Sequence, residues 1–485
     1  MRRLLAALAF TLAGAAHAQT GVTVGMQLEP PILDPTAGAA AAIDEVTYAN
    51  VFEGLTRFAP DGSIVPGLAR SWTISDDGLT YTFHLVEGAT FHDGAPFDAD
   101  AVVFSLDRAR DPEGPNTQQA LYAAIERVEA LDPATVRVTL SRPVGMLLFN
   151  LAWGDAVIVH PDTAETNATE PVGTGPFRFA SWARGDRIVL ERNPDYWGEP
   201  AALERATFRF IADPNAAFAA VMTEDVDVFP GFPAPELLAQ IEADPRFDVV
   251  LGSTEGQTIL AMNHRREALA DVRVRRAIAH AIDRQAIIDG AMFGFGVPIG
   301  THFAPHHPAY LDLTAQSAHD PEQAKALLAE AGAEGLRLSL KLPPPAYARR
   351  GGEIVAAQLR AVGIETTIAN LEWAQWLEEV FRGHDFDLTI IAHTEPMDIG
   401  IYARPDYYFG YRNPAFDAVI AALDAESDPD AQTRLLQEAQ RILADDFVNA
   451  FLFQLPRTGV ANARLSGLWE NAPHPANDLT GVSWR

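Results

Sequence analysis

The chain has 485 residues, of which 48% are hydrophobic and 21% are charged, and it contains no cysteine. This length predicts two to four domains, and the composition supplies enough apolar side chains for a substantial core. The formal net charge of −29 disfavours nucleic acid and anionic membrane surfaces as partners, and without cysteine there are no disulfides, thiolate metal sites or cysteine nucleophile.

The first 18 residues have the pattern of a cleaved export signal. Arg2 and Arg3 precede a short apolar run, and Ala16-His17-Ala18 fits a small-x-small cleavage site. The apolar run is shorter than the roughly 20 residues that a membrane-spanning helix needs. The missing cysteine also excludes a lipid anchor on that residue. We therefore expect a protein exported to the periplasm of a Gram-negative bacterium and not lipid-anchored.

The segment after this signal predicts an α/β unit with an insertion. Residues 22–26 are predicted to form a strand, and a helix is predicted over 43–52. Alternating strands and two helices predict an inserted subdomain over 58–170. Its clearest stretch, residues 72–108 (WTISDDGLTYTFHLVEGATFHDGAPFDADAVVFSLDR), has the pattern strand, turn, strand, loop and helix, with Asp98 as the helix N-cap.

The second half of the chain alternates helices and strands. Asp271 is a predicted N-cap, and the apolar residues after it recur at helical spacing. Gly332 is predicted to end a later helix. The following β-α-β-β rhythm fits an α/β lobe, with strands at 336–340, 364–368 and 388–391 and a helix at 351–361. Residues 146–153 form an apolar run that fits a strand or a buried helix equally well.

Four blocks of the chain resemble one family, the bacterial extracellular solute-binding proteins of the peptide/nickel-binding type (family 5), which supply ABC importers. The blocks are 72–108, 171–198, 260–298 and 411–417. The resemblance implies an α/β, two-lobe periplasmic binding protein fold of type II, with an extra subdomain on lobe I and a hinge of two crossing strands near 257–263 and 451–457. It places the signal peptide at 1–18, lobe I at 19–256 with the insertion at 58–170, lobe II at 257–457, and a return to lobe I at 458–485.

The function implied by this resemblance is capture of a peptide or peptide-like small solute between the lobes, with delivery to an ABC permease in the inner membrane. Such a component works as a monomer, makes and breaks no covalent bond and needs no cofactor. Two alternatives on the same chain are a periplasmic hydrolase, which would show turnover, and a peptide-binding chaperone or sensor.

Catalytic and metal-binding patterns are weak in this sequence. There is no Gly-x-Ser-x-Gly motif, and with 65 acidic residues some paired carboxylates are expected by chance. His302, His306 and His307 form the best histidine cluster, in a proline-containing loop. No carboxylate or cysteine accompanies them at ligand spacing, so the sequence predicts no metal site.

The resemblance also implies which segments contact the solute. They are the loop after the first strand, the loop before the helix near residue 350, and the segment after the strand near residue 390. Aromatic side chains concentrated close to the last two segments are expected to contribute as well. The predicted ligand-binding residues are Gln27, Glu29, Arg350, Trp373, Trp376, His393, Thr394, Glu395, Asp398, Tyr402 and Tyr407.

Two features bear on the kind of solute. Dipeptide-binding members of the family place an acidic residue after the strand near 390 for the peptide amine, and Glu395 or Asp398 could take that role. The arginine that they use for the peptide carboxylate falls on Leu342 here, so Arg349 or Arg350 would have to replace it. Aromatic faces with carboxylates nearby also suit a cationic solute, so an amine, a quaternary ammonium compound or an opine is the alternative cargo.

Overall fold

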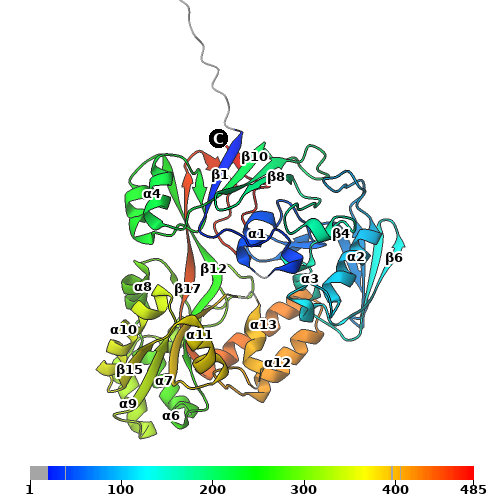
Figure 1. The fold of residues 1–485 in the computed structure, drawn as a ribbon. Helices are drawn as coiled ribbons and strands as arrows, with labels where there is room; N and C mark the ends of the chain where they lie inside the picture. Colours follow the sequence, from blue (N-terminus) through cyan, green and yellow to red (C-terminus); the bar gives the residue numbers. More distant parts are fainter. Residues whose placement is uncertain (1–19, 39, 395–396, 405) are drawn as a thin grey trace, which may run out of the picture.

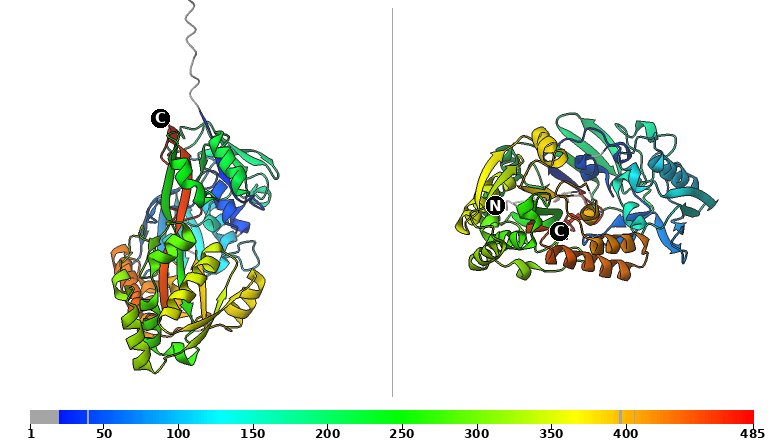
Figure 2. Two further views of the ribbon diagram at one scale, coloured as in Figure 1. Left: turned by 90° about the vertical axis from the view of Figure 1, so that its left-hand side faces the viewer. Right: turned by 90° about the horizontal axis from the view of Figure 1, so that it is seen from below.

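The computed structural model describes residues 20–38, 40–394, 397–404 and 406–485. It consists of two α/β halves joined by two long strands that run through both (Figure 1). These strands, β12 (Phe247–Met262) and β17 (Asn449–Asn462), pair antiparallel with each other. The side view in Figure 2 shows β17 passing through both halves of the molecule. The two-lobe α/β class predicted from the sequence is confirmed.

The main sheet extends from these two strands in both directions. In lobe II, β12 is followed by β16 (Leu388–His393), β14 (Arg337–Leu342) and β15 (Glu365–Asn370). In lobe I, β17 is followed by β11 (Val228–Phe229), β1 (Gly21–Met26), β10 (Arg205–Phe210), β9 (Arg187–Arg192) and β8 (Phe177–Ala183). The segments at the ends of β1, β11 and β16 line one cavity between the lobes, which is described below.

The ladder between β12 and β17 is interrupted where the strands pass from one lobe to the other. Ser253 pairs with Pro456, and the next pair is Gln257 with Gln454. The three residues 254–256 on β12 thus lie opposite Leu455 alone. Such irregularities bend strands and remove ladder hydrogen bonds, so this stretch is the natural pivot between the lobes, and we call it the hinge.

Each lobe has its own apolar interior. The buried members of two hydrophobic cores all lie between Ile259 and Phe453, which defines lobe II. The buried members of the other four cores lie outside that span, in lobe I. Phe295 of lobe II packs against one lobe I core at the junction. Because packed cores resist deformation, the lobes are suited to move as rigid bodies.

The helices of lobe II end where local signals predict. The side chain of Asp271 accepts a hydrogen bond from the Arg273 backbone N–H and caps α7, and Gly332 ends α9 at a φ of 67°. In the part of the chain that is described, no helix is both long and apolar enough to cross a membrane. The principal helices are α7 (Val272–Ala281), α8 (Arg284–Met292), α9 (Pro321–Ala331), α10 (Ala346–Ala361), α12 (Pro414–Ala425) and α13 (Pro429–Asp445).

The inserted part of lobe I forms a second sheet. Its strand order is β4 (Ala69–Ile74), β5 (Thr80–Leu85), β7 (Thr135–Leu140) and β6 (Ile125–Asp132), and α2 (Ala99–Arg110) packs on it. The Asp98 side chain accepts hydrogen bonds from two backbone N–H groups at the start of α2, as predicted. We call this unit the subdomain.

The helix predicted over 351–361 begins five residues earlier, at Ala346, and two other predicted elements also differ. The helix expected over 43–52 is α1 (Ala41–Thr47), and the chain leaves the helix before Ala49, which has a φ of 58°. The ambiguous run at 146–153 contains the single helical turn α3 (Leu147–Asn150). Turns that depend on tertiary packing have no strong local signal, which explains both differences.

Candidate ligand-binding site

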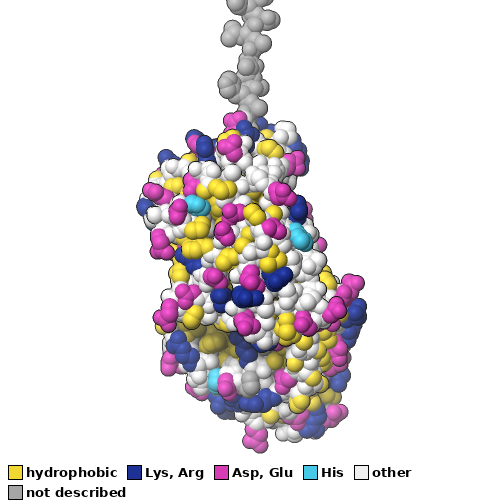
Figure 3. Space-filling view, turned by 90° about the vertical axis from the view of Figure 1, so that its right-hand side faces the viewer, with side chains coloured by type: hydrophobic (Ala, Val, Ile, Leu, Met, Phe, Trp, Pro, Cys, Tyr) yellow, Lys and Arg dark blue, Asp and Glu magenta, His cyan; other side chains and the backbone are white. Residues whose placement is uncertain are grey.

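A cavity of about 560 Å³ lies between the two lobes beside the hinge. This volume falls within the range that proteins use for small-molecule ligands. On the side of the molecule drawn in Figure 3, the surface is hollowed between the lobes and exposes hydrophobic side chains there. The lining comes from residues 25–28, Ala41, Glu45, 229–232, Pro235, 254–256, Met292, Phe295, Thr394, 455–458 and 472–477.

Most of the wall is apolar. Phe229 and Phe232 contribute from lobe I and Phe295 from lobe II, and Leu455 contributes from the hinge. Phe229 and Phe232 are packed edge to face, with ring centroids 5.8 Å apart. A cavity of this kind binds the apolar body of a solute and relies on a few polar groups for orientation.

Two of the charged side chains at the cavity are already engaged. His306 Nε2 donates a hydrogen bond to Glu255 Oε1 over 2.6 Å, and the Ser253 hydroxyl lies 2.6 Å from His306 Nδ1. Arg457 Nη1 donates to the carbonyls of Trp469 and Asn471, each over 3.0 Å. Both groups therefore hold protein segments together at the hinge.

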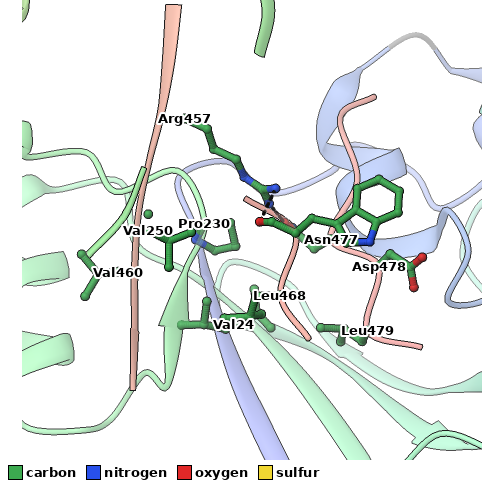
Figure 4. A pocket seen from close by; sticks show the side chains of 12 residues that line it. Val24, Pro230, Val250, Arg457, Val460, Leu468, Asn477, Asp478 and Leu479 are labelled. Atoms are coloured by element: carbon green, nitrogen blue, oxygen red, sulfur yellow. Dashed lines mark hydrogen bonds between the residues drawn. The ribbon is translucent and has the colours of Figure 1, made fainter. Parts of the chain in front are cut away.

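Arg457 also borders a small cavity inside lobe I. This cavity has a volume of about 20 Å³, which is enough for one water molecule. In Figure 4 the guanidinium of Arg457 points toward Asn477, and its Nη2 donates to Asn477 Oδ1 over 3.2 Å. The small cavity is too confined for the solute, so the larger cavity between the lobes is the candidate site.

Glu45, on α1, is the remaining acidic side chain at the cavity. Within the described residues its carboxylate makes no hydrogen bond or ion pair, and only its backbone carbonyl accepts one, from Asn477 Nδ2. Burial raises the pKa of Glu45, the Arg457 charge lowers it, and the Asp44 charge raises it further. The carboxylate is thus partly desolvated without a partner of its own.

The lobe I wall behind Glu45 is held by His474. Its Nε2 lies 3.3 Å from Asp44 Oδ2, and the ring is fully buried. The ring centroid of His474 lies 4.4 Å from that of Tyr48 and 5.3 Å from that of Phe58. This packing fixes the C-terminal loop, and with it part of the cavity wall, against α1.

Of the residues predicted from the sequence to contact a ligand, Gln27 and Thr394 line the cavity. Gln27 lies on lobe I, where its Nε2 donates to the Gly231 carbonyl over 2.7 Å. Thr394 follows β16 on lobe II and is exposed. The cavity therefore brings together two predicted residues from opposite lobes.

Four other predicted residues lie away from the cavity. Glu29 accepts hydrogen bonds from Trp182 Nε1 and the Gly185 backbone N–H, over 2.9 and 3.0 Å. Trp376 is buried in lobe II, and its Nε1 donates to Thr389 Oγ1. Arg350 and Trp373 are exposed on lobe II, Arg350 over the ring of Phe293. The structure does not place these side chains against the cavity in this arrangement of the lobes.

The predicted residues around Asp398 form a packed cluster inside lobe II. Asp398 Oδ1 accepts a hydrogen bond from His302 Nε2 over 2.8 Å, and its Oδ2 lies 3.5 Å from His393 Nδ1. Tyr402 is buried beside this cluster, and Tyr407 is half-buried with its ring centroid 6.0 Å from that of His393. Glu395 lies outside the described residues.

The charges within this cluster balance each other. Burial by itself raises the pKa of Asp398, but the charges and hydrogen bonds of His302 and His393 outweigh burial and hold this pKa below its ordinary range. Gln257, on β12, donates to Asp398 Oδ1 over 3.2 Å. Asp398 therefore connects the wall of lobe II to the hinge strand and is not free for a ligand amine.

The histidines singled out in the sequence separate in space. His302 joins Asp398, and His306 joins Glu255. His307 stacks on Phe303, with ring centroids 4.3 Å apart. Among the described residues, no group of three or more histidine, aspartate or glutamate side chains is arranged to hold a metal ion.

Several cavity residues were missed by sequence reasoning. Those named here come from four separate segments: Glu45, Phe229 with Phe232, Phe295, and the loop at 472–477. Two prolines flank His474 in that loop, and glycines flank Phe295, which signals rigid or tight backbone at both places. Neither signal reveals that the two segments face the same space, because that depends on how the lobes dock.

The fold and the cleft define a two-lobe solute-binding protein. Comparison with known sequences specifies the family: the chain matches "Bacterial extracellular solute-binding proteins, family 5 Middle" over residues 63–413, and it belongs to that family. It is 31% identical to Di/tripeptide-binding protein 4 of Pseudomonas aeruginosa, over 90% of each chain. It is 29% identical to the dipeptide-binding protein of Escherichia coli, over 91% of this chain and 90% of that one.

Solved structures agree with this assignment. HbpA2 from Haemophilus parasuis superposes with a TM-score of 0.88 at 26% identity, covering 96% of this chain and 100% of that one. DppA from Helicobacter pylori in complex with the peptide STSA has a TM-score of 0.76 at 25% identity, covering 96% and 98%. MppA, a murein tripeptide-binding protein in an unliganded open form, has a TM-score of 0.85 at 22% identity, covering 97% and 98%.

Proposed function

We propose that this chain captures a peptide or peptide-like small solute in the cavity between its lobes and delivers it to the permease of an ABC importer. The observation that carries the proposal is a cavity of about 560 Å³ at the junction of two separately packed lobes. The names of its relatives, a di/tripeptide-binding and a dipeptide-binding protein, support the peptide class of cargo. The chain binds its cargo and performs no chemistry on it.

The lobes would work as a two-state hinge. The higher TM-score to an open, unliganded relative than to one holding a peptide, 0.85 against 0.76, supports an open form here. A solute that contacts both walls binds the closed form better, and it shifts the population by that difference in affinity. Closure would turn the lobe II wall, with Thr394 and Phe295, toward the lobe I wall, with Gln27.

The predicted contacts then divide into two groups. Gln27 and Thr394 would touch the solute directly, and the exposed Arg350, Trp373 and the half-buried Tyr407 would reach it after closure. The second group supports the walls from behind. It consists of Glu29, Trp376, His393, Asp398 and Tyr402, whose side chains are engaged with other protein groups.

The place of action would be the periplasm. Residues 1–18, the predicted signal, lie outside the described residues, so this part of the proposal rests on their sequence. Expression with the signal should yield a monomer in the periplasmic fraction, as judged by cell fractionation and light scattering. Its intact mass in mass spectrometry should be that of a chain that begins after Ala18. Retention of the uncleaved chain in the cytoplasm would contradict it.

The decisive experiment identifies the cargo. We would purify the protein from periplasm without denaturation, release bound molecules by unfolding, and identify them by mass spectrometry. In parallel, thermal unfolding is recorded with a panel of di- and tripeptides, since a ligand that binds only the native state raises the unfolding temperature. If no peptide co-purifies and none raises that temperature, peptide binding is refuted.

A further inference from the structure

The charged side chains at the cavity differ in whether they already have a partner within the protein. Among the described residues that line it, Arg457 is the single lysine or arginine, and its guanidinium donates three hydrogen bonds to protein acceptors. Glu255 is buried and bound to His306. Glu45 is the one acidic side chain there whose carboxylate has no such partner.

A desolvated carboxylate without a partner is costly, and a cationic group removes that cost. The cavity wall around it is apolar and aromatic, which strengthens a charge-assisted hydrogen bond by excluding water. The lobe II acid that the sequence offered for this purpose, Asp398, is already bound by His302 and His393.

We propose that Glu45 is the subsite for a cationic group of the solute, an ammonium or guanidinium, and that the described residues lining the cavity in this arrangement provide no matching subsite for an anion. This inference rests on the proposed function and specifies its cargo: the amine of the solute is required for binding, whereas a carboxylate is not. Recognition of the cation would therefore come from lobe I, at α1.

The pH dependence follows from the groups around Glu45. Burial raises its pKa, so in the free protein the carboxylate takes up a proton more readily than an exposed one. A cation must displace that proton, and its affinity falls as the pH is lowered through the raised pKa. The other charged or titratable groups facing this place are Asp44 on α1, Arg457 on β17 and His474 in the C-terminal loop.

The test uses matched probes and matched variants. The probes are Leu-Leu, its N-acetyl derivative without the amine, its C-terminal amide without the carboxylate, and agmatine as a non-peptide cation. The variants are Glu45→Gln and, as control, Glu242→Gln on the exposed end of α5 (Leu238–Glu242). Calorimetry at pH 7 and pH 4.5 gives the affinities, and circular dichroism verifies folding.

We expect Leu-Leu and its amide to bind the wild type and the control alike, with N-acetyl-Leu-Leu at least tenfold weaker. Glu45→Gln should weaken amine-bearing probes by about 10- to 100-fold, the range of a charge-assisted hydrogen bond. The loss of affinity between pH 7 and pH 4.5 should be smaller in Glu45→Gln than in the wild type, because the glutamine side chain has no proton that the cation must displace.

Each other outcome has a distinct meaning. If N-acetyl-Leu-Leu binds as well as Leu-Leu, or if Glu45→Gln binds as tightly as the control, the cation subsite is overturned while peptide binding stands. If only agmatine binds and Glu45→Gln abolishes it, the subsite stands and the peptide cargo is overturned. If no probe with a cation binds, the subsite is overturned as well.

Discussion

In addition to the hinge strands, a contact between the subdomain and lobe II joins the two lobes, and we call it the side bridge. In the subdomain, the Gly145 backbone N–H donates to the Asp424 carbonyl over 2.7 Å, and Gln432 Nε2 donates to the Gly145 carbonyl over 2.5 Å. Asp424 and Gln432 belong to α12 and α13 of lobe II, which lie alongside the subdomain in Figures 1 and 2. Because the lobes pivot elsewhere, these bonds cannot persist at every lobe angle, so they stabilise the present one.

Gly145→Ala should break the side bridge. A Cβ atom at this position would lie 2.2 Å from the Glu426 carbonyl oxygen and 2.3 Å from that of Leu423, so the segments must separate. Two hydrogen bonds at about 0.5–1.5 kcal/mol each give about 1–3 kcal/mol in the balance between lobe arrangements, or about 5- to 150-fold. Gln432→Ala removes one of the two bonds between the lobes without a clash, together with the bond from Gln432 Nε2 to the Glu426 carbonyl within lobe II. Loss of the single interlobe bond should shift the balance about fivefold, for about 1 kcal/mol.

The measurement is a distance between the lobes. The chain has no cysteine, so Glu199→Cys on lobe I and Ala326→Cys on lobe II, both exposed positions, take two spin labels without interference. The distance distribution of the ligand-free protein should change most in Gly145→Ala and less in Gln432→Ala. Gly481→Ala is the control, since a Cβ atom there meets nothing within 4 Å. Distributions equal to that of the wild type in both bridge variants would refute the reasoning.

Three further predictions concern single side chains. Asp155 is buried, and burial together with the nearby Asp44 raises its pKa from 3.8 to about 7. A raised folded-state pKa contributes stability at low pH that is lost as the pH rises through about 7. The free energy of unfolding in urea should therefore be higher for Asp155→Asn than for the wild type at pH 8, by roughly 1–3 kcal/mol, and equal to it at pH 4. Equal free energies of unfolding at pH 8 would contradict this. Asp398→Asn breaks a buried pair with His302, which should lower the free energy of unfolding by about 3–5 kcal/mol at pH 7, as followed by thermal unfolding. Because the pKa of Asp398 is lowered, the difference between variant and wild type should shrink on acidification. An unchanged unfolding temperature at pH 7 would exclude a stabilising pair between Asp398 and His302. Trp373 is 44% exposed, so Trp373→Ala should change the free energy of unfolding by less than about 0.5 kcal/mol yet lower the affinity for the ligand once it is identified. Loss of stability without loss of affinity would mean that the indole packs against the protein and does not contact the ligand.

Local signals in the sequence predicted local structure well. Asp98, Asp271 and Gly332 mark helix ends in the structure because caps satisfy backbone groups within a few residues. The strands of lobe II are also found close to their predicted places, since buried strands carry a pattern of their own. The helix predicted over 43–52 was too long because the turn at Ala49 depends on contacts that the local sequence does not encode.

The site was less predictable for a physical reason. An aromatic side chain satisfies the same pattern whether it faces a core or a cleft, and Tyr402 turned out to be 1% exposed. Glu45 was hidden among the 65 acidic residues of the chain. Glu45 differs from the other acidic residues because its carboxylate has no partner and because the nearby Arg457 is already hydrogen-bonded to other groups. Both properties arise only from tertiary structure. Gln27 and Thr394, two of the residues implied by the resemblance to a family, line the cavity, but the resemblance does not specify the chemistry of the solute.

The sparse connection between the lobes determines what a solute must do to close them. Besides the two hinge strands and the bonds of His306 to Glu255 and Ser253, the contacts described above are Phe295 on a lobe I core and the side bridge at Gly145. We therefore expect the free-energy difference between the lobe arrangements to be small. A charge-assisted hydrogen bond of about 1.5–3 kcal/mol is then comparable with that difference. Yet a cation held by Glu45 alone binds both arrangements equally and shifts neither, since only differential affinity moves the equilibrium. The length of the solute therefore matters as much as its charge: it must extend from Glu45 to Thr394 and Phe295 on the opposite lobe before its binding energy can close the hinge.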